Sequence, residues 1–412
     1  MISVEKALQT IHDAAGALPS RVLPISNCAG YILDEEIVAT ENVPPFDNSA
    51  MDGYAVIAAD LHDASYEQPV LLNVIDIIQA GKVSEKKLRN GQAMQIMTGA
   101  PLPEGADAVI MAEQTEKTQD GKVKFFTTVV TNENCRRAGD DIKIGSSVFQ
   151  KGRQLKPYDI GVLASIGRTN VRIIPRPRIA ILSTGDELAA IDRPLPPGKI
   201  RTSNNYTLQV LIGQLGAEVI DLGIVKDTLQ DTNEKLQKAL FADIILTSGG
   251  VSVGEFDFVG EALKHAGVNI KFWKVKQKPG KPLMFGTLDE KLFFGLPGNP
   301  VSSIICFELF VVPAIKKMSG LSDTTPLCIK AESGETITKK PGLRHFLRGF
   351  VVKENNIFKV SPTKNQSSGA LSSLSQANCL IDLPEEKENI RPGEEVSVIL
   401  LDTDILKKWF CS

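Results

Sequence analysis

Residues 177–188 read PRIAILSTGDEL, a short apolar run that ends in a Ser-Thr-Gly turn and two acids. Residues 243–250, DIILTSGG, show the same arrangement, with an apolar run followed directly by Ser-Gly-Gly. Both patterns are typical of a buried strand that leads into a polar loop. They predict a sheet whose strands carry polar loops at their carboxyl ends.

The flanking sequence alternates predicted strands and helices from about residue 177 to about residue 320. Residues 218–222 and 293–296 predict two further strands, and helices are expected at 203–215, near 256–266 and at 301–315. Gly216 and Gly267 follow two of these helices, where a positive φ is favoured. Asn299 is expected as the N-cap of the last helix and Pro300 as its first residue. This alternation predicts a doubly wound α/β domain with a largely parallel sheet.

The rest of the chain is β-rich, apart from two short helices. Residues 3–17 predict an amphipathic helix, and residues 25–145 consist of short β-prone runs separated by turns. A second helix is expected at 157–167. It could pack against the first helix, which would make the β-rich part an insertion. After residue 325 the β pattern returns, with a hairpin predicted over FLRGFVVKENNIFKVSP.

Length and composition exclude several classes of protein. A chain of 412 residues predicts two to four domains, and its 46 basic and 49 acidic residues give a net charge of −3, with no general attraction to nucleic acid or anionic membranes. No apolar run approaches the ~18 residues of a membrane span, and no signal-peptide pattern opens the sequence. We therefore expect a cytoplasmic protein. The six dispersed cysteines and four histidines argue against a zinc hydrolase.

Polar clusters follow the predicted strands at the edge where α/β proteins bind ligands. Residues 183–187 follow the first strand, Asp227 follows the second, and residues 247–252 follow the third, with Asp257 near the next helix. A Ser-Gly-Gly turn before a helix exposes N–H groups that suit a phosphate. The alternative is that these residues only form turns and helix caps.

A lysine-rich segment favours an anionic ligand. Residues 271–286, KFWKVKQKPGKPLMFG, contain five lysines and no acid, and Lys274, Lys276 and Lys278 would share one face of a strand. Their repulsion calls for an anion or for carboxylates. The alternative is a solvated edge strand. With the acids nearby, the segment favours a divalent metal, Mg²⁺ rather than zinc, and a phosphate-bearing or oxyanion substrate.

Two other motifs have competing interpretations. Residues 295–303, GLPGNPVSS, predict either a second anion site at a helix start or a simple helix entry. Residues 250–254 match the G-x-S-x-G pattern of hydrolases. Ser252, however, lies five residues beyond Thr247, whereas that pattern places its serine directly at the strand end, so the motif argues weakly for a serine hydrolase.

In combination, eight segments resemble the molybdopterin molybdenumtransferase (MoeA) family, which includes the C-terminal domain of gephyrin. They are PPFDNSAMDGYA (44–55), MTGAPLPEGADAVIMAEQT (97–115), RRAGDDI (136–142), STGDEL (183–188), LGIVKD (222–227), TSGGVSVGEFD (247–257), KPGKP (278–282) and GLPGNPVS (295–302). The resemblance covers nearly the whole chain. It implies four domains: 1–24 with 146–176 as a discontinuous linker or dimerisation domain, an inserted β-rich domain at 25–145, the α/β molybdopterin-binding domain at 177–322, and a C-terminal β domain at 323–412.

The resemblance also implies an activity and a site. Proteins of this family insert molybdenum from molybdate into adenylylated molybdopterin, with Mg²⁺, and release AMP and molybdenum cofactor. They are homodimers, and the enzyme that adenylylates molybdopterin is a candidate partner. The implied catalytic acids are Asp52, Asp141, Glu187, Asp227 and Asp257, and Glu187, Asp227 and Asp257 are the implied metal ligands. The implied substrate-binding residues are Thr98, Ser248, Gly249, Gly250, Ser252, Lys274, Lys278, Lys281, Pro297 and Pro300.

The sequence departs from the family at one position and leaves two alternatives. Thr202 stands where the family usually has an acid before the helix at 203–215, although Thr202 or Ser203 could still cap that helix. One alternative is a molybdopterin adenylyltransferase, whose fold resembles only the α/β domain. The other is a non-catalytic scaffold built on the same fold, as in gephyrin.

Overall fold

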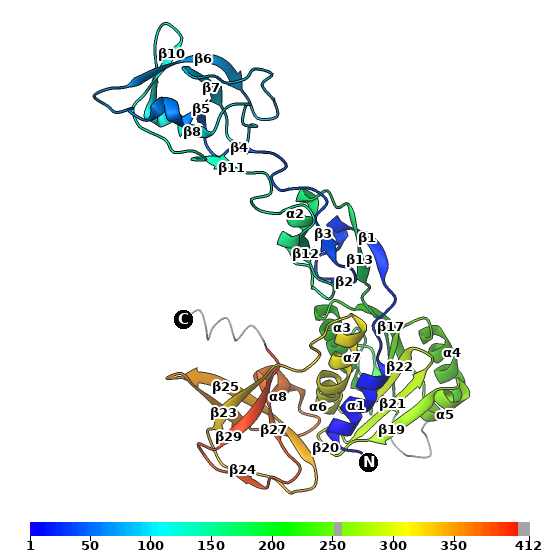
Figure 1. Cartoon of the computed structure of the whole chain (residues 1–412). Coiled ribbons are helices and arrows are strands. Elements are labelled where there is room, and N and C mark those ends of the chain that lie inside the picture. Colours follow the sequence, from blue (N-terminus) through cyan, green and yellow to red (C-terminus); the bar gives the residue numbers. More distant parts are fainter. Residues whose placement is uncertain (251–257, 403–412) are drawn as a thin grey trace. The chain divides into compact units, whose positions relative to one another are not determined.

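The computed structural model describes residues 1–250 and 258–402. Its contacts divide the chain into two compact units (Figure 1). The first, called here the main unit, contains Met1–Arg21, Gly30–Ile32 and the chain from Ile173 onward. The second, the inserted unit, contains Val22–Ala29 and Leu33–Arg172. Among the described residues, no helix has the length and apolar character needed to cross a bilayer.

The main unit contains the expected α/β sheet. Its strand order is β17-β14-β18-β22-β21-β19. The first four strands are parallel to one another. Strand β21 pairs antiparallel with β22, and β19 pairs antiparallel with β21. The bounds are β14 (Arg178–Thr184), β17 (Glu218–Val225), β18 (Ile244–Ser248), β19 (Asn269–Lys274), β21 (Pro282–Leu288) and β22 (Lys291–Leu296). The largely parallel sheet expected from the sequence is confirmed.

Helices cover both faces of this sheet, as Figure 1 shows. Strand β14 explains why, because Ile179 and Ile181 point to one apolar core while Ala180 and Leu182 point to the other. The first core includes α1 (Val4–Ala14), α3 (Asn204–Gln214), α6 (Pro300–Cys306) and α7 (Val312–Met318). The second includes α4 (Leu229–Ala239) and α5 (Phe258–His265). The fold is therefore doubly wound, as predicted.

One helix prediction needs correction. The single helix expected at 301–315 consists of α6, a π-helical segment at Phe307–Val311 and α7. The first helix, α1, packs against α7 and the π-helical segment, whereas α2 (Pro157–Ser165) packs against η1 (Ile25–Asn27). These contacts lie within the unit of each helix, and the expected packing of the second helix against the first remains a prediction. The predicted domain boundaries remain a prediction.

The C-terminal part of the main unit forms a β domain. The predicted hairpin is present as β25 (Arg344–Glu354) and β26 (Ile357–Pro362), and its turn places Asn355 and Asn356 at φ of 48° and 64°. Strand order is β20-β25-β26-β23-β29-β27, and β27 also pairs with β25. The remaining bounds here are β20 (Gln277–Lys278), β23 (Cys328–Ser333), β24 (Ile337–Thr338), α8 (Leu371–Gln376), β27 (Cys379–Leu383), β28 (Asn389–Ile390) and β29 (Glu395–Leu400).

The inserted unit is β-rich, as expected. Its largest sheet has the order β8-β5-β7-β6-β10-β9. These strands are β5 (Gly53–Val56), β6 (Val70–Ile78), β7 (Gln92–Ile96), β8 (Ala108–Met111), β9 (Thr115–Lys117) and β10 (Lys122–Phe125). Shorter elements are β3 (Ile37–Val38), β4 (Asn48–Ser49), η2 (Ala58–Leu61), η3 (Ala112–Gln114), β11 (Cys135–Arg136) and β12 (Ser147–Phe149). Strands β1 (Arg21–Pro24), β2 (Ile32–Leu33) and β13 (Asn170–Ile174) lie where the chain passes between units.

Candidate functional site

A cavity of about 350 Å³ lies at the carboxyl ends of β14 and β18. Its wall also includes the short pair β15 (Leu188–Ala189) and β16 (Ile200–Arg201), the start of α3 and the turn before α6. The lining residues are Ser183, Thr184, Glu187, Leu188, Ile200, Arg201, Thr202, Ser203, Asn204, Ser248, Gly298, Asn299 and Pro300. Glu187, Ser248 and Pro300 were predicted site residues. The cavity lies where the carboxyl ends of parallel strands are expected to bind a ligand.

Two consecutive asparagines at the start of α3 organise this wall. The Asn204 side-chain amide donates to Ser248 Oγ at 2.7 Å and to the Gly298 carbonyl oxygen at 2.9 Å. The Asn205 amide donates to Asp221 Oδ1 at 3.1 Å and accepts a hydrogen bond from the Ser183 hydroxyl. Both asparagines are buried. They therefore join the start of α3 to strands β14, β17 and β18 and to the turn before α6.

Two buried polar atoms of the wall have no hydrogen-bond partner among the residues that the structure describes. They are Asn204 Oδ1 and Thr184 Oγ1. A buried polar atom without a partner costs about 1–3 kcal/mol. Such atoms are consistent with a cavity whose hydrogen bonds are completed by a ligand or by water.

The start of α3 lacks a side-chain cap, which corrects one expectation. Ser203 occupies the N-cap position, but its side chain accepts no hydrogen bond from the first turn. Thr202 is buried, and its N–H donates to the carbonyl of Ala189 at 3.0 Å. Neither side chain caps the helix. Within residues 1–250 and 258–402 the first-turn N–H groups have no capping partner, and together with the helix dipole they favour an anion at this end of α3.

The start of α6 is different, because the C-terminal β domain covers part of it. Asn299 occupies the N-cap position without making a capping bond, and its amide donates to Ser368 Oγ at 3.2 Å. The Ser368 carbonyl accepts the Val301 N–H at 3.1 Å. Pro300 has no N–H to offer. The anion site expected at 295–303 is therefore weakened, since Ser368 takes one of its few donors.

The glycines after β18 allow close approach of two loops. Gly249 and Gly250 have φ of 92° and 63°. A Cβ atom on Gly249 would lie 2.5 Å from the Thr184 carbonyl oxygen, and one on Gly250 would lie 2.5 Å from Thr184 Oγ1. Only glycine fits at either position. The predicted Ser-Gly-Gly turn is thus pressed against the end of β14 at the cavity.

Acids gather at the edge of the cavity. The Asp186 N–H donates to Asp227 Oδ2 at 3.2 Å, and the Asp227 N–H donates to Asp186 Oδ1 at 3.3 Å. Burial raises the pKa of the Asp227 carboxyl, and the charges of Asp186 and Glu187 add to this effect. A divalent cation would relieve that repulsion, and carboxylate oxygens suit Mg²⁺. Across residues 1–250 and 258–402, however, no three acids, histidines or cysteines converge as metal ligands.

The predicted lysines do not form one face of a strand. Strand β19 ends at Lys274, and the N-terminal Ile2 then pairs with the chain at Val275. Lys276 forms an ion pair with Glu385 at 3.6 Å, and Lys278 belongs to β20 in the sheet of the C-terminal β domain. Lys274, Lys278 and Lys281 do not line the described cavity. The expectation failed because the chain changes sheets within this segment.

The remaining predicted residues fall into three groups. In the inserted unit, Asp52 accepts the N–H of Thr98 at 2.6 Å and its hydroxyl at 2.8 Å, which lowers the pKa of Asp52. Asp141 is exposed in the same unit. Pro297 is buried in the turn before α6 without lining the cavity. The predicted residues Ser252 and Asp257 lie outside the described residues.

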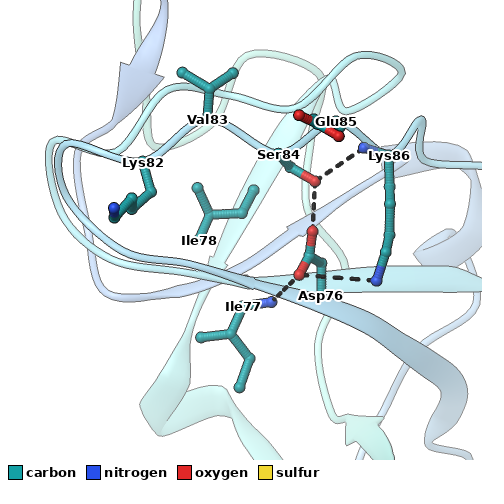
Figure 2. A pocket seen from close by; sticks show the side chains of 8 residues that line it. All are labelled: Asp76, Ile77, Ile78, Lys82, Val83, Ser84, Glu85 and Lys86. Carbon is teal, nitrogen blue, oxygen red and sulfur yellow. Dashed lines mark hydrogen bonds and ion pairs between the residues drawn. The ribbon is translucent and has the colours of Figure 1, made fainter.

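A second hollow lies in the inserted unit, beside β6 (Figure 2). Its volume is about 340 Å³, and none of the predicted site residues lines it. Asp76 accepts the Ser84 hydroxyl at 2.6 Å and lies 3.9 Å from Lys86 Nζ, which also donates to the Ile75 carbonyl at 2.6 Å. Asp76, Ser84 and Lys86 therefore satisfy one another, as the dashed lines in Figure 2 show.

Sequence reasoning missed three residues whose hydrogen bonds hold the cavity wall together. Asn204 and Asn205 were assigned only to a helix, and Ser368 to no site. The Ser-Asn-Asn run at a helix start was the available signal, because asparagine is uncommon inside helices. For Ser368 the sequence contains no comparable signal, since its role depends on how the C-terminal β domain packs.

A doubly wound domain with a donor-rich cavity at the carboxyl edge of its parallel strands defines a class of ligand-binding α/β proteins. Comparison with known proteins identifies the family within this class. Residues 2–167 match the model of the MoeA N-terminal region (domain I and II), residues 180–317 a probable molybdopterin binding domain, and residues 330–401 the MoeA C-terminal region (domain IV).

Similar proteins agree over nearly the full length. The chain is 39% identical to a molybdopterin molybdenumtransferase of Haemophilus influenzae over 91% of this chain and 92% of that protein. It is 37% identical to one of Staphylococcus aureus strain COL over 98% and 96%. The crystal structure of a molybdopterin biosynthesis MoeA protein from Pyrococcus horikoshii superposes with a TM-score of 0.83, at 31% identity, over 98% of this chain and 99% of that one. The chain belongs to the molybdopterin molybdenumtransferase (MoeA) family of enzymes.

Proposed function

We propose that this chain inserts molybdenum into adenylylated molybdopterin, with molybdate as the second substrate, and releases AMP and molybdenum cofactor. The observation that supports this reaction best is the cavity at the carboxyl ends of β14 and β18. Its wall offers the Ser248 hydroxyl and the uncapped start of α3 to an anion. The pyrophosphate that joins the pterin to adenosine is such an anion. These donors would hold it while a water oxygen bonds to one phosphorus and the P–O–P link breaks, which leaves AMP and a phosphate on the pterin.

We include Mg²⁺ in the proposal. Glu187 lines the cavity, and Asp227 lies beside Asp186 with a raised pKa, so oxygen ligands and excess negative charge occur together. Glu187 and Asp227 would hold the ion, with Asp257 as the further predicted ligand. Bound there, Mg²⁺ would neutralise charge on the pyrophosphate.

The proposal also includes a cytoplasmic homodimer, which the family resemblance implies. For a chain of 44.7 kDa, light scattering on the purified protein is expected to give twice that mass. A monomer at working concentration would remove the dimer from the proposal.

The reaction is tested by measuring AMP release from adenylylated molybdopterin with Mg²⁺, with and without molybdate. We expect release that depends on molybdate in the wild type and is lost in Glu187→Gln and Asp257→Ala. Glu261→Gln, on the exposed side of α5, is the matched control and should retain activity. If folded wild-type protein releases no AMP, the transferase proposal is wrong. Consumption of ATP with molybdopterin would instead favour the adenylyltransferase, and inactivity in both assays would favour the scaffold.

A further inference from the structure

The Asn204 amide has a fixed orientation in the cavity wall. Its Nδ2 group lies 2.9 Å from the Gly298 carbonyl oxygen and 2.7 Å from Ser248 Oγ. A carbonyl oxygen can only accept, so it determines which side of the amide carries the two N–H groups. Asn204 is 9% exposed and Ser248 is 3% exposed, so water competes little for these bonds. Both Asn204 donors are therefore committed within the wall.

This orientation determines what Ser248 offers to a ligand. The hydroxyl accepts from Asn204, which occupies one of its oxygen lone pairs. Within residues 1–250 and 258–402, Ser248 donates to no acceptor. Because Ser248 lines the cavity and no described residue accepts its O–H, a ligand in the cavity can accept that hydrogen bond. Asn204 Oδ1, on the other side of the amide, has no partner in the same part of the chain.

We propose that Asn204 is a positioning residue for substrate binding, which makes Ser248 a hydrogen-bond donor to the phosphate of the ligand. This inference rests on the proposed function, because it needs an anion in the cavity. The uncapped start of α3 lines the same cavity. The Ser248 O–H and the first-turn N–H groups can therefore donate to the same phosphate group. Asn204 itself need not touch the ligand.

The inference makes Asn204→Asp more harmful than Asn204→Ala. The aspartate has nearly the same shape as asparagine, so a purely structural role would tolerate it better than alanine. Its carboxylate, however, would accept the Ser248 O–H and turn it away from the ligand. It would also lie against the Gly298 carbonyl with no proton to share.

The test measures binding of AMP and of adenosine to the full chain by calorimetry. We expect Asn204→Ala to weaken AMP binding about 10-fold, and Asn204→Asp to weaken it about 100-fold or more. The affinity for adenosine, which lacks the phosphate, should change less than about 2-fold in both variants. Asn299→Asp is the charge-matched control, because it adds a carboxylate to the same cavity without contacting Ser248. The loss of AMP affinity in Asn299→Asp should be about 10-fold smaller than the loss in Asn204→Asp.

A double-mutant cycle separates the positioning role from a direct contact. In a Ser248→Ala background, Asn204→Ala should weaken AMP by less than about 2-fold, since the donor that it orients is already absent. Effects that simply multiply would overturn the inference, as would equal losses of AMP and adenosine. The cycle uses only alanine variants, so it stands even if Asn204→Asp does not fold.

Two outcomes distinguish this inference from the proposed function. If the wild type binds neither AMP nor inorganic pyrophosphate, the cavity holds no anion and the inference is wrong. If the wild type binds AMP with the expected variant effects but shows no molybdate-dependent AMP release, the inference stands and the transferase proposal fails.

Discussion

The cavity of the α/β sheet and the hollow beside β6 have nearly the same size, about 350 and about 340 Å³, but their polar groups differ. In the hollow, Asp76, Ser84 and Lys86 satisfy one another. In the cavity, Asn204 Oδ1 and Thr184 Oγ1 are buried and have no partner among the described residues. The comparison teaches that the state of the hydrogen bonds, more than the volume, distinguishes a ligand site from a surface hollow.

The two regions differ because of how their walls are built. The cavity wall combines the ends of two parallel strands, a helix start and two glycine-containing turns, so several elements direct donors to one place. The hollow is lined by part of β6 and by the loop that follows it, residues 82–86, whose side chains can reach each other locally. Convergence of segments that are distant in sequence leaves polar groups that no neighbour can satisfy.

The largest expected difference is in activity. Glu187→Gln removes the one carboxylate that lines the described cavity, whereas Asp76→Asn makes the same change in the hollow. We expect Glu187→Gln to lower kcat/KM for molybdate-dependent AMP release at least about 100-fold, because it removes charge and a proposed metal ligand from the site. Asp76→Asn should change it less than about 2-fold. Similar losses in both variants would break the comparison.

A smaller difference is expected in stability at two glycines. Gly249 at the cavity and Gly81 beside the hollow both have a positive φ, of 92° and 78°. An added Cβ would lie 2.5 Å from the Thr184 carbonyl oxygen at Gly249, but at Gly81 it would meet nothing within 4 Å. Chemical denaturation should give a loss of about 1 kcal/mol for Gly81→Ala, from the positive φ alone. Gly249→Ala should lose about 3 kcal/mol or more, because the clash adds to that strain.

Equal losses in the two glycine variants would show that the loops after β14 and β18 can separate without cost. The close approach at Gly249 would then have no part in shaping the cavity. A larger loss in Gly249→Ala, with AMP binding weakened in parallel, would sharpen the contrast between the two regions.

Much of this fold could be predicted from local sequence. The strand runs at 178–184 and 244–248 are apolar enough for both faces to be buried, and the polar loops that follow them predicted the cavity edge. The hairpin turn at Asn355 and Asn356 was predictable because asparagine tolerates a positive φ. These features depend on residues close together in the chain.

Features that depend on distant segments could not be predicted. The lysine segment reads as one alternating strand, yet it changes sheets because Ile2 pairs beside it at Val275. Asn299 reads as a helix cap, yet its amide binds Ser368 from the C-terminal β domain. In both cases a tertiary contact, invisible in the local pattern, outweighs the local preference.

The smallest expected difference concerns two acids, Asp76 beside the hollow and Asp227 at the cavity edge, and how each makes the free energy of unfolding depend on pH. The Ser84 hydroxyl, the Ile77 N–H and the Lys86 charge lower the pKa of Asp76, whereas burial and neighbouring acids raise the pKa of Asp227. A lowered pKa contributes stability that is present at neutral pH and is lost as the pH falls through the folded-state pKa. A raised pKa has the opposite sign, so the ionised Asp227 opposes folding at neutral pH and this cost disappears in acid.

Asp76→Asn should therefore destabilise the protein at pH 7, and Asp227→Asn should stabilise it, each by about 0.5 kcal/mol because both groups are partly solvated. As the pH falls, the Asp227→Asn difference should shrink first, through the raised folded-state pKa of Asp227, and the Asp76→Asn difference should shrink at lower pH, through the lowered folded-state pKa of Asp76. Urea unfolding midpoints between pH 3 and 8, measured with a chelator, would check this. If Asp227 holds Mg²⁺ as proposed, adding Mg²⁺ should remove the advantage of Asp227→Asn, because the cation would stabilise the wild-type carboxylate. If both variants change the free energy of unfolding in the same direction, the environments of Asp227 and Asp76 do not differ in the way that the comparison requires.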